Sequence, residues 1–192
     1  MEAWTEVNLV SARMMDQALL AEQVDVLVHE QLGEEIATWF FFWEPELRLR
    51  IRWRDAGRAA EHRRTLAGLL DDWKAERIVD DWYEGGHGAR GETYVGEADH
   101  YGAEVWPRIQ KDWMNGSELA LALIKLGRAG KLTKPPDYHW KRRVHLFTNQ
   151  LFGTWEAEIE LCLQQALGYS RLRGASPTPQ AARLIAELHD LL

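Results

Sequence analysis

Four arginines stand at alternate positions in the stretch ELRLRIRWR, which runs from residue 46 to residue 54. Because successive side chains of a strand point to opposite faces, the arginines should share one face and the apolar residues between them the other. The arginines are Arg48, Arg50, Arg52 and Arg54. Arginine grips carboxylates and phosphates through paired hydrogen bonds, so the row could bind an anionic ligand. The alternative is compensation by the protein's own acids, for which the candidates are Asp71, Asp72, Asp80 and Asp81.

Two of the seven histidines, His100 and His145, stand where they could transfer protons. His100 precedes a glycine at a predicted loop-to-helix junction, a place where side chains often face a cleft. His145 lies on an amphipathic helical stretch, where it is either a core histidine or a general acid or base. His87 lies in the glycine-rich stretch EGGHGARGE, where an exposed histidine is the default. No histidine spacing matches a zinc site and no cofactor motif is present, so we expect neither a metal nor a cofactor.

The elements that position these residues follow from hydrophobic periodicity and turn signals. Strands are predicted over 4–10 and 92–95, and a β-hairpin over about 37–54 with Pro45 in its turn. Residues 83–94 are glycine-rich and are expected to form a loop. Helices are predicted over 12–32, 58–76, 141–167 and 180–191, and over 101–126 with breaks at Pro107 and at Asn115-Gly116. The pattern predicts a single α+β domain over 1–192, with a small mixed or antiparallel sheet covered by helices and a helical C-terminal half.

Composition narrows the class of protein. The chain has 192 residues, 46% of them hydrophobic, and a net charge of −7, which argues against broad nucleic-acid binding. No apolar run is long enough to suggest a membrane span, and the N-terminal residues do not resemble a signal peptide. The lone cysteine, Cys162, cannot form an internal disulfide, which fits a cytoplasmic protein. Ten tryptophans indicate an aromatic cavity or partner surface, and a homodimer is one such possibility.

Several stretches, taken in order, resemble the C-terminal domain of lantibiotic dehydratases, which also occurs as stand-alone thiopeptide-type bacteriocin biosynthesis proteins. The stretches are WTEVNLV from Trp4, ELRLRI from Glu46, YVGEADHYGA from Tyr94 and HLFTNQLFG from His145. The third is similar to a family pattern Tyr-x-x-Glu-x-x-Arg-Tyr-Gly-Gly, and the fourth to His-x-x-x-Asn-x-Leu-Gly.

The resemblance implies work on a ribosomally made precursor peptide. In eliminating relatives, a glutamyl group loaded from glutamyl-tRNA by a partner enzyme leaves Ser or Thr as glutamate; other relatives close a pyridine ring by a formal [4+2] addition. The resemblance assigns catalytic roles to Arg48, Arg50, His100 and His145, and substrate binding to Arg52, Tyr101 and Glu46. Two positions depart from the family: Glu46 replaces a histidine, and His100 replaces the motif arginine.

Three functions remain open. The first is a lyase or cyclase that acts on a precursor peptide, without direct nucleic-acid or membrane contact. The second is a catalytically inactive module of the same pathway that binds a peptide or a partner. The third is a domain whose arginines are all paired internally and whose partner is another protein.

Overall fold

A computed structural model describes residues 2–11, 17–43, 46–135, 138–139 and 142. The chain divides into two compact units, Met1–Leu132 and Thr133–Leu192, and every element named below lies in the first. The predicted single domain over 1–192 stays a prediction. The helices predicted over 141–167 and 180–191, apart from residue 142, lie outside the described residues, as does His145.

The described residues contain a five-stranded antiparallel sheet with the strand order β2-β3-β1-β4-β5. The strands are β1 (Trp4–Val10), β2 (Ile36–Trp43), β3 (Leu47–Trp53), β4 (Asp81–Gly86) and β5 (Ala89–Arg90). The predicted α+β class is confirmed, and β2 and β3 pair as the predicted hairpin.

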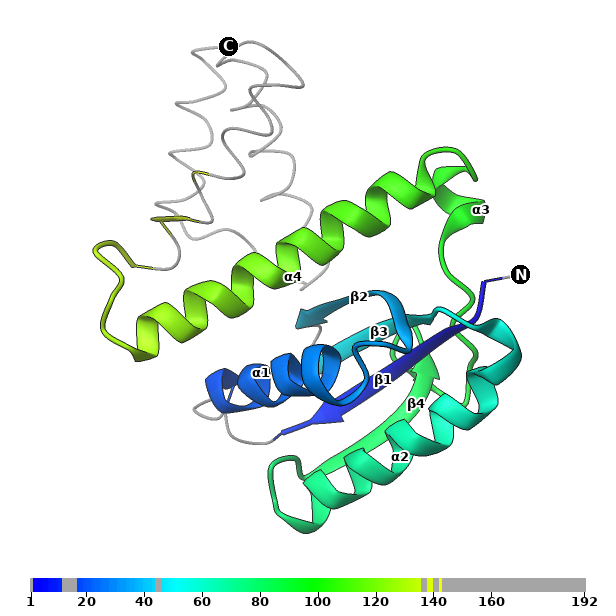
Figure 1. Cartoon of the computed structure of the whole chain (residues 1–192), viewed down its shortest axis with the longest axis horizontal. Coiled ribbons are helices and arrows are strands. Elements are labelled where there is room, and N and C mark those ends of the chain that lie inside the picture. Colours follow the sequence, from blue (N-terminus) through cyan, green and yellow to red (C-terminus); the bar gives the residue numbers. More distant parts are fainter. Residues whose placement is uncertain (1, 12–16, 44–45, 136–137, 140–141, 143–192) are drawn as a thin grey trace, which may run out of the picture. The chain divides into compact units, whose positions relative to one another are not determined.

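Helices lie between β1 and β2 and between β3 and β4, and two more follow β5 (Figure 1). They are α1 (Gln17–Val26) with a π-helical continuation (Leu27–Gln31), a 3₁₀ turn (Ala56–Arg58) leading into α2 (Ala59–Ala75), α3 (Ala98–Tyr101) and α4 (Trp106–Arg128). No described helix has the length and apolar character needed to cross a membrane.

The two faces of the sheet are buried against different partners. On one face the apolar residues of β3, such as Leu49 and Ile51, join a core with α1 and α2 residues such as Val24 and Leu70. On the other face Trp4 and Phe40 form an aromatic cluster with residues of the chain after β5, and the arginines of β3 share that face. The predicted alternation of β3 is therefore confirmed, but its arginine face is largely covered.

Helix α4 is one continuous helix, so the predicted breaks are wrong. Pro107 stands in its first turn, where the missing N–H costs nothing, and Gly116 is tolerated in the interior. The hydroxyl of Ser117 accepts a hydrogen bond of 3.0 Å from the backbone N–H of Phe41. Since β2 is an edge strand, this contact satisfies a donor that the sheet leaves unpaired, and it explains why α4 runs beside β2 (Figure 1).

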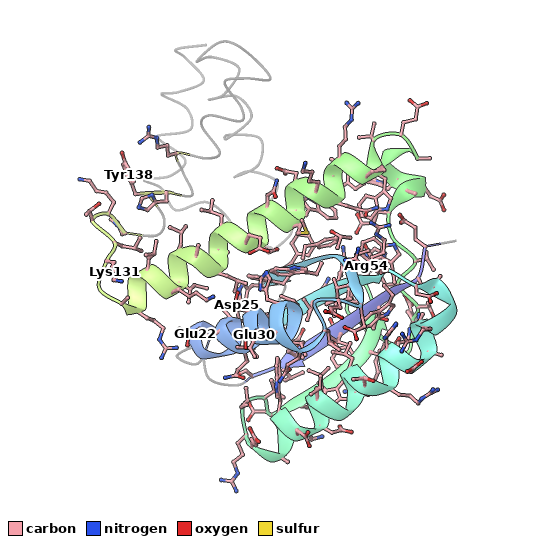
Figure 2. The ribbon with its side chains drawn as sticks, viewed as in Figure 1. Glu22, Asp25, Glu30, Arg54, Lys131 and Tyr138 are labelled. Carbon is pink, nitrogen blue, oxygen red and sulfur yellow. The ribbon has the colours of Figure 1, made fainter. Side chains whose placement is uncertain are left out.

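Ion pairs join α1 and its continuation to α4. Glu22 pairs with Arg128, and Asp25 pairs with Lys125. Figure 2 labels the two acids on α1. The imidazole of His29 lies 2.9 Å from a Glu118 oxygen and 3.1 Å from an Asp25 oxygen. Partial burial lowers the pKa of His29, but the hydrogen bond to Glu118 and the two carboxylate charges outweigh it and raise the pKa above its usual value.

The glycine-rich stretch after α2 is a β-hairpin, so the predicted loop over 83–94 is wrong in its first half. Its two turn residues, His87 and Gly88, both have positive φ, of 52° and 78°, as a two-residue type I′ turn requires. The strand predicted over 92–95 is absent, because the chain there is irregular. Tyr94 in this irregular segment is nonetheless buried in the aromatic cluster.

Candidate functional site

A buried ion network surrounds Arg50 at the centre of the sheet. Its side chain is 6% exposed, and its Nε donates to Glu6 of β1 at 2.7 Å. Its Nη1 donates to Glu97 at 2.5 Å. Glu6 and Glu97 lie 91 positions apart in the sequence, and the Arg50 guanidinium binds both of their carboxylates.

An aromatic ring and an imidazole complete the surroundings of this guanidinium. The carbon of the Arg50 guanidinium lies 4.2 Å from the ring centroid of Tyr94, and Nη1 donates to the Tyr94 hydroxyl at 3.4 Å. The Tyr94 hydroxyl also donates to Glu97 at 3.3 Å. Nη2 lies 3.4 Å from Nδ1 of His87, whose ring packs edge-on against Tyr94. We call Glu6, Arg50, His87, Tyr94 and Glu97 the Arg50 cluster.

Strand register and turn geometry assemble the Arg50 cluster. The antiparallel pairing of β1 with β3 sets Glu6 directly opposite Arg50 on one face. The β4–β5 turn then delivers His87 to the guanidinium, while the backbone N–H of Gly88 donates to Glu6 at 2.8 Å. A Cβ at Gly88 would lie 2.6 Å from the Arg48 guanidinium, the end of a flexible side chain that can move aside, so glycine is favoured there mainly by its positive φ.

The charge balance of the cluster restricts what Arg50 can bind. Two carboxylates face one guanidinium, and their side chains are 0% and 15% exposed. A further anion at Arg50 would have to displace one of them and would add to an existing excess of negative charge. In the described structure, Arg50 therefore holds protein groups in position instead of offering a vacant carboxylate clamp.

The phenols near the network are held in their protonated form. Burial is the main cause that raises the pKa of the Tyr94 phenol. The positive charge of Arg50 lowers this pKa, and the carboxylate of Glu97 raises it further. Burial also raises the pKa of Tyr101, again with a contribution from Glu97. Both hydroxyls are therefore hydrogen-bond donors at neutral pH.

The other arginines of the row interact with different protein groups. Arg52 donates to Glu2 at 3.3 Å. Arg54, at the end of the row (Figure 2), donates to the backbone carbonyls of Glu34 and Ile36 at 3.0 and 2.9 Å. Arg48 is half-buried beside the β4–β5 turn.

The acids that contact Arg50 and Arg52 are not the expected aspartates. Asp81 pairs with Lys74 and Arg90, and Asp71 accepts from the indole of Trp82. The acids that contact Arg50 and Arg52 are three glutamates, Glu2, Glu6 and Glu97. Asp71 and Asp72 lie on α2, which packs against the other face of the sheet. Asp80 and Asp81 lie just before and at the start of β4, on the far side of β1 from β3.

The structure brings together some of the predicted site residues. Tyr101 lies within electrostatic range of Glu97 and Arg50. His100 is exposed, and its ring packs 4.6 Å from that of Tyr101, so it stands one ring away from the cluster. Glu46 is half-buried just before β3, four residues or about 13 Å of extended chain from Arg50. No cluster of metal-ligating side chains occurs among the described residues.

Sequence reasoning did not select four members of the cluster: Glu6, His87, Tyr94 and Glu97. Tyr94 and Glu97 are the first and fourth residues of the stretch YVGEADHYGA, so the resemblance carried a signal for them. For Glu6 the only signal is an acid within a strand pattern, WTEVNLV, that also contains Thr5 and Asn8. His87 is exposed, as its loop-like sequence predicts, and nothing local indicates its contact with Arg50.

The fold and the cluster describe an α+β domain in which an antiparallel sheet carries a buried, charged centre between two of its strands and the chain after β5. Residues 4–186 match the family model described as "Lantibiotic biosynthesis dehydratase C-term", and the chain belongs to this family. Membership assigns the protein to the modification of ribosomally synthesised peptides, with a role alongside a precursor peptide. Neither the comparison with curated proteins nor that with solved structures gives a match.

Proposed function

We propose that this protein is an enzyme that acts on a modified precursor peptide, as a lyase that eliminates glutamate or as a related [4+2] cyclase. The observation that carries the proposal is the contact of Arg50 with Tyr94 and Glu97. Two of the stretches that resemble the family thus meet at one buried guanidinium. Burying such a charged centre costs desolvation free energy, and charged groups with strongly altered environments are common at functional sites.

In the elimination, a base removes the α-proton of a glutamylated Ser or Thr. The electron pair forms the Cα–Cβ double bond, the Cβ–O bond breaks, and glutamate departs as a carboxylate. No oxidant or cofactor is consumed. His100 and His145 are the candidate bases, and substrate glutamylation falls to a glutamyl-tRNA-dependent partner enzyme.

Arg50 acts in this proposal as a positioning residue. Since a guanidinium only donates, the Nδ1 of His87 that it faces must be an acceptor, and the ring proton of neutral His87 then sits on Nε2. The exposed Nε2–H can donate to a substrate carbonyl as negative charge develops on it during α-proton removal. Arg48 keeps its proposed catalytic role, and Arg52, Tyr101 and Glu46 remain proposed contacts of the peptide.

The test uses the precursor peptide encoded beside the gene, glutamylated by its partner enzyme, with release of glutamate followed by mass spectrometry. We expect His87→Ala to slow turnover about 100-fold, the scale of one lost donor at a developing oxyanion. Tyr94→Phe, which removes the hydroxyl between Arg50 and Glu97, should slow turnover less. Arg90→Gln, in an exposed ion pair beside the same turn, is the matched control and should keep full activity. Unchanged turnover in both cluster variants would refute the role given to the cluster.

The second candidate is a catalytically inactive module that binds the peptide or a partner enzyme. It is favoured by the saturation of Arg50 with protein carboxylates, which leaves no vacant clamp for a glutamyl group at this guanidinium. It predicts calorimetric binding of the same peptide with no change in its mass after prolonged incubation. Turnover by the wild-type protein would eliminate this candidate.

A further inference from the structure

The side-chain carboxylate of Glu2 sits at the convergence of four donors outside the Arg50 cluster. The indole Nε1 of Trp4 donates to it at 3.0 Å and that of Trp106 at 3.2 Å. The amide of Gln110 contacts both oxygens, at 3.4 and 3.5 Å, and Nη1 of Arg52 donates at 3.3 Å. We call these four side chains the carboxylate cradle.

Three of the four donors of the carboxylate cradle are far more buried than the group they bind. Trp4, Trp106 and Gln110 are 1%, 2% and 3% exposed, whereas the Glu2 side chain is 37% exposed. Two indoles, which have only one donor each and no acceptor, converge on one oxygen of Glu2. Buried donors need an acceptor, so this arrangement calls for a carboxylate whether or not Glu2 supplies it.

Gly96 keeps the carboxylate cradle open. Its φ is +86°, and a Cβ there would lie 2.9 Å from Nε1 of Trp4 and 3.3 Å from Nε1 of Trp106. Any larger residue would therefore occupy the space in front of the two indole N–H groups. The backbone of the family-like stretch approaches the cradle without filling it.

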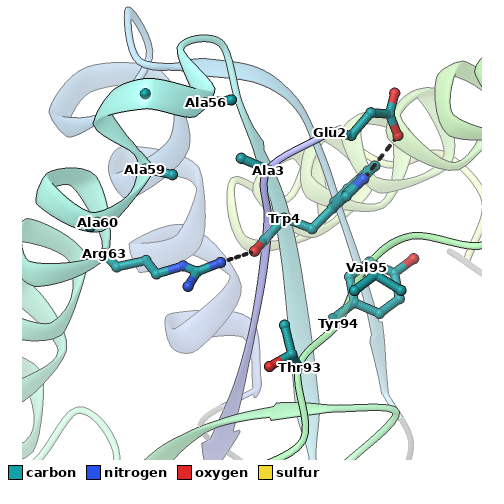
Figure 3. Close-up of a pocket in the computed structure, with 11 residues that line it drawn as sticks. Glu2, Ala3, Trp4, Ala56, Ala59, Ala60, Arg63, Thr93, Tyr94 and Val95 are labelled. Carbon is teal, nitrogen blue, oxygen red and sulfur yellow. Dashed lines mark hydrogen bonds between the residues drawn. The ribbon is translucent and has the colours of Figure 1, made fainter.

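Open space adjoins the cradle. Glu2 and Trp4 also line a pocket of about 440 Å³, together with residues of the 3₁₀ turn, α2 and the segment after β5. Figure 3 shows the Glu2 carboxylate turned to the Trp4 indole at the rim of this pocket, with Arg63, Thr93 and Val95 around the remainder. A ligand whose carboxylate replaced that of Glu2 would have room beside it.

We propose that the carboxylate cradle is a binding site for an aliphatic side-chain carboxylate of a peptide, and that Glu2 occupies it in the free protein as an intramolecular mimic. Binding requires Glu2 to leave, so the tethered side chain competes with the ligand and lowers its apparent affinity. The assignment does not depend on the lyase reaction, because it concerns binding alone.

The experiment measures indole ¹H–¹⁵N signals of the full chain during titration with N-acetylglutamic acid α-amide, which carries one carboxylate on the same two methylenes as Glu2. Trp4→Phe and Trp106→Phe assign the two signals. In Glu2→Ala we expect both to shift saturably, at a probe concentration at least tenfold lower than in the wild type, because a short tether holds its competitor at a millimolar effective concentration. The neutral N-acetylglutamine α-amide should leave both signals in place.

Two further variants sharpen the result. Gly96→Ala in the Glu2→Ala background should abolish the shifts, and Glu76→Ala, an acid at the far end of α2, should respond like the wild type. If Glu2→Ala does not fold, Glu2→Gln, which keeps the volume and loses the charge, is titrated with the same expectations. The proposal is overturned if neither signal moves, or if the probe acts equally on the wild type and the Glu2 variant. Loss of turnover with intact probe binding would count against the lyase function only.

Discussion

Replacing Arg50 by methionine should destabilise the protein more than any change to an exposed charge. The substitution keeps much of the side-chain volume but leaves Glu6, which is 0% exposed, without its cation. Breaking a buried ion pair from one side costs about 3–5 kcal/mol, since the remaining charge stays desolvated. Glu97 is 15% exposed and can turn toward water, so Glu6 should account for most of the loss.

We therefore expect a loss of about 4 kcal/mol in the free energy of unfolding, which corresponds to a Tm lower by about 12 °C for a protein of this size. Urea titration followed by tryptophan fluorescence and by near-ultraviolet circular dichroism measures the change. Coincident transitions in the two signals would justify two-state treatment.

A second substitution identifies the cause. Glu6→Gln removes the stranded charge but keeps an oxygen that can accept from the Gly88 N–H. The double variant Arg50→Met/Glu6→Gln should regain about 2 kcal/mol over Arg50→Met, a coupling typical of groups in direct contact. Arg58→Met is the matched control, because its pair with Glu61 is exposed, and its midpoint should not change measurably. The reasoning fails if Arg50→Met lies within 1 kcal/mol of the wild type, or if the double variant is no more stable than the single one.

Three other predictions concern stability. The folded-state pKa of His29 is raised, so its ion pair with Glu118 stabilises the protein below about pH 6, and this contribution fades as pH rises through the folded pKa. In urea titrations, His29→Gln should therefore cost about 0.5 kcal/mol at pH 5.5 and nothing at pH 8.5. A difference that stays constant with pH would contradict this. Gly88→Ala should lower stability by about 1 kcal/mol through its positive φ. Gly91→Ala, with a similar φ and open space, should cost about as much by thermal unfolding, because the Arg48 guanidinium that a Cβ at residue 88 would approach can move aside. Ser117→Ala removes the acceptor of the Phe41 N–H on edge strand β2 and should cost about 1 kcal/mol in the free energy of unfolding. Hydrogen exchange of the Phe41 amide should become faster in this variant, and Ser117→Thr should restore its protection.

Local pattern was sufficient for the elements with strong periodicity. The alternation in β3 and the turn signal before it predicted the β2–β3 hairpin, because both depend on neighbours in the sequence. Local pattern failed to predict the β4–β5 hairpin, because glycines indicate a loop and a hairpin turn equally well. It also failed at Asn115-Gly116, where packing of α4 along β2 outweighs the poor helix propensity of both residues.

By itself, the sequence determined that four arginines share a strand face, that the chain is α+β, and that ordered stretches resemble one family. Only the tertiary structure decided which acids meet those arginines. Glu6 reaches Arg50 through the register of β1 against β3, and Glu97 through the irregular chain after β5. Such contacts depend on strand order and on the closure of long loops, which side-chain periodicity does not encode. For the same reason, the convergence of Trp4, Trp106 and Gln110 on the Glu2 carboxylate could be found only in the folded chain.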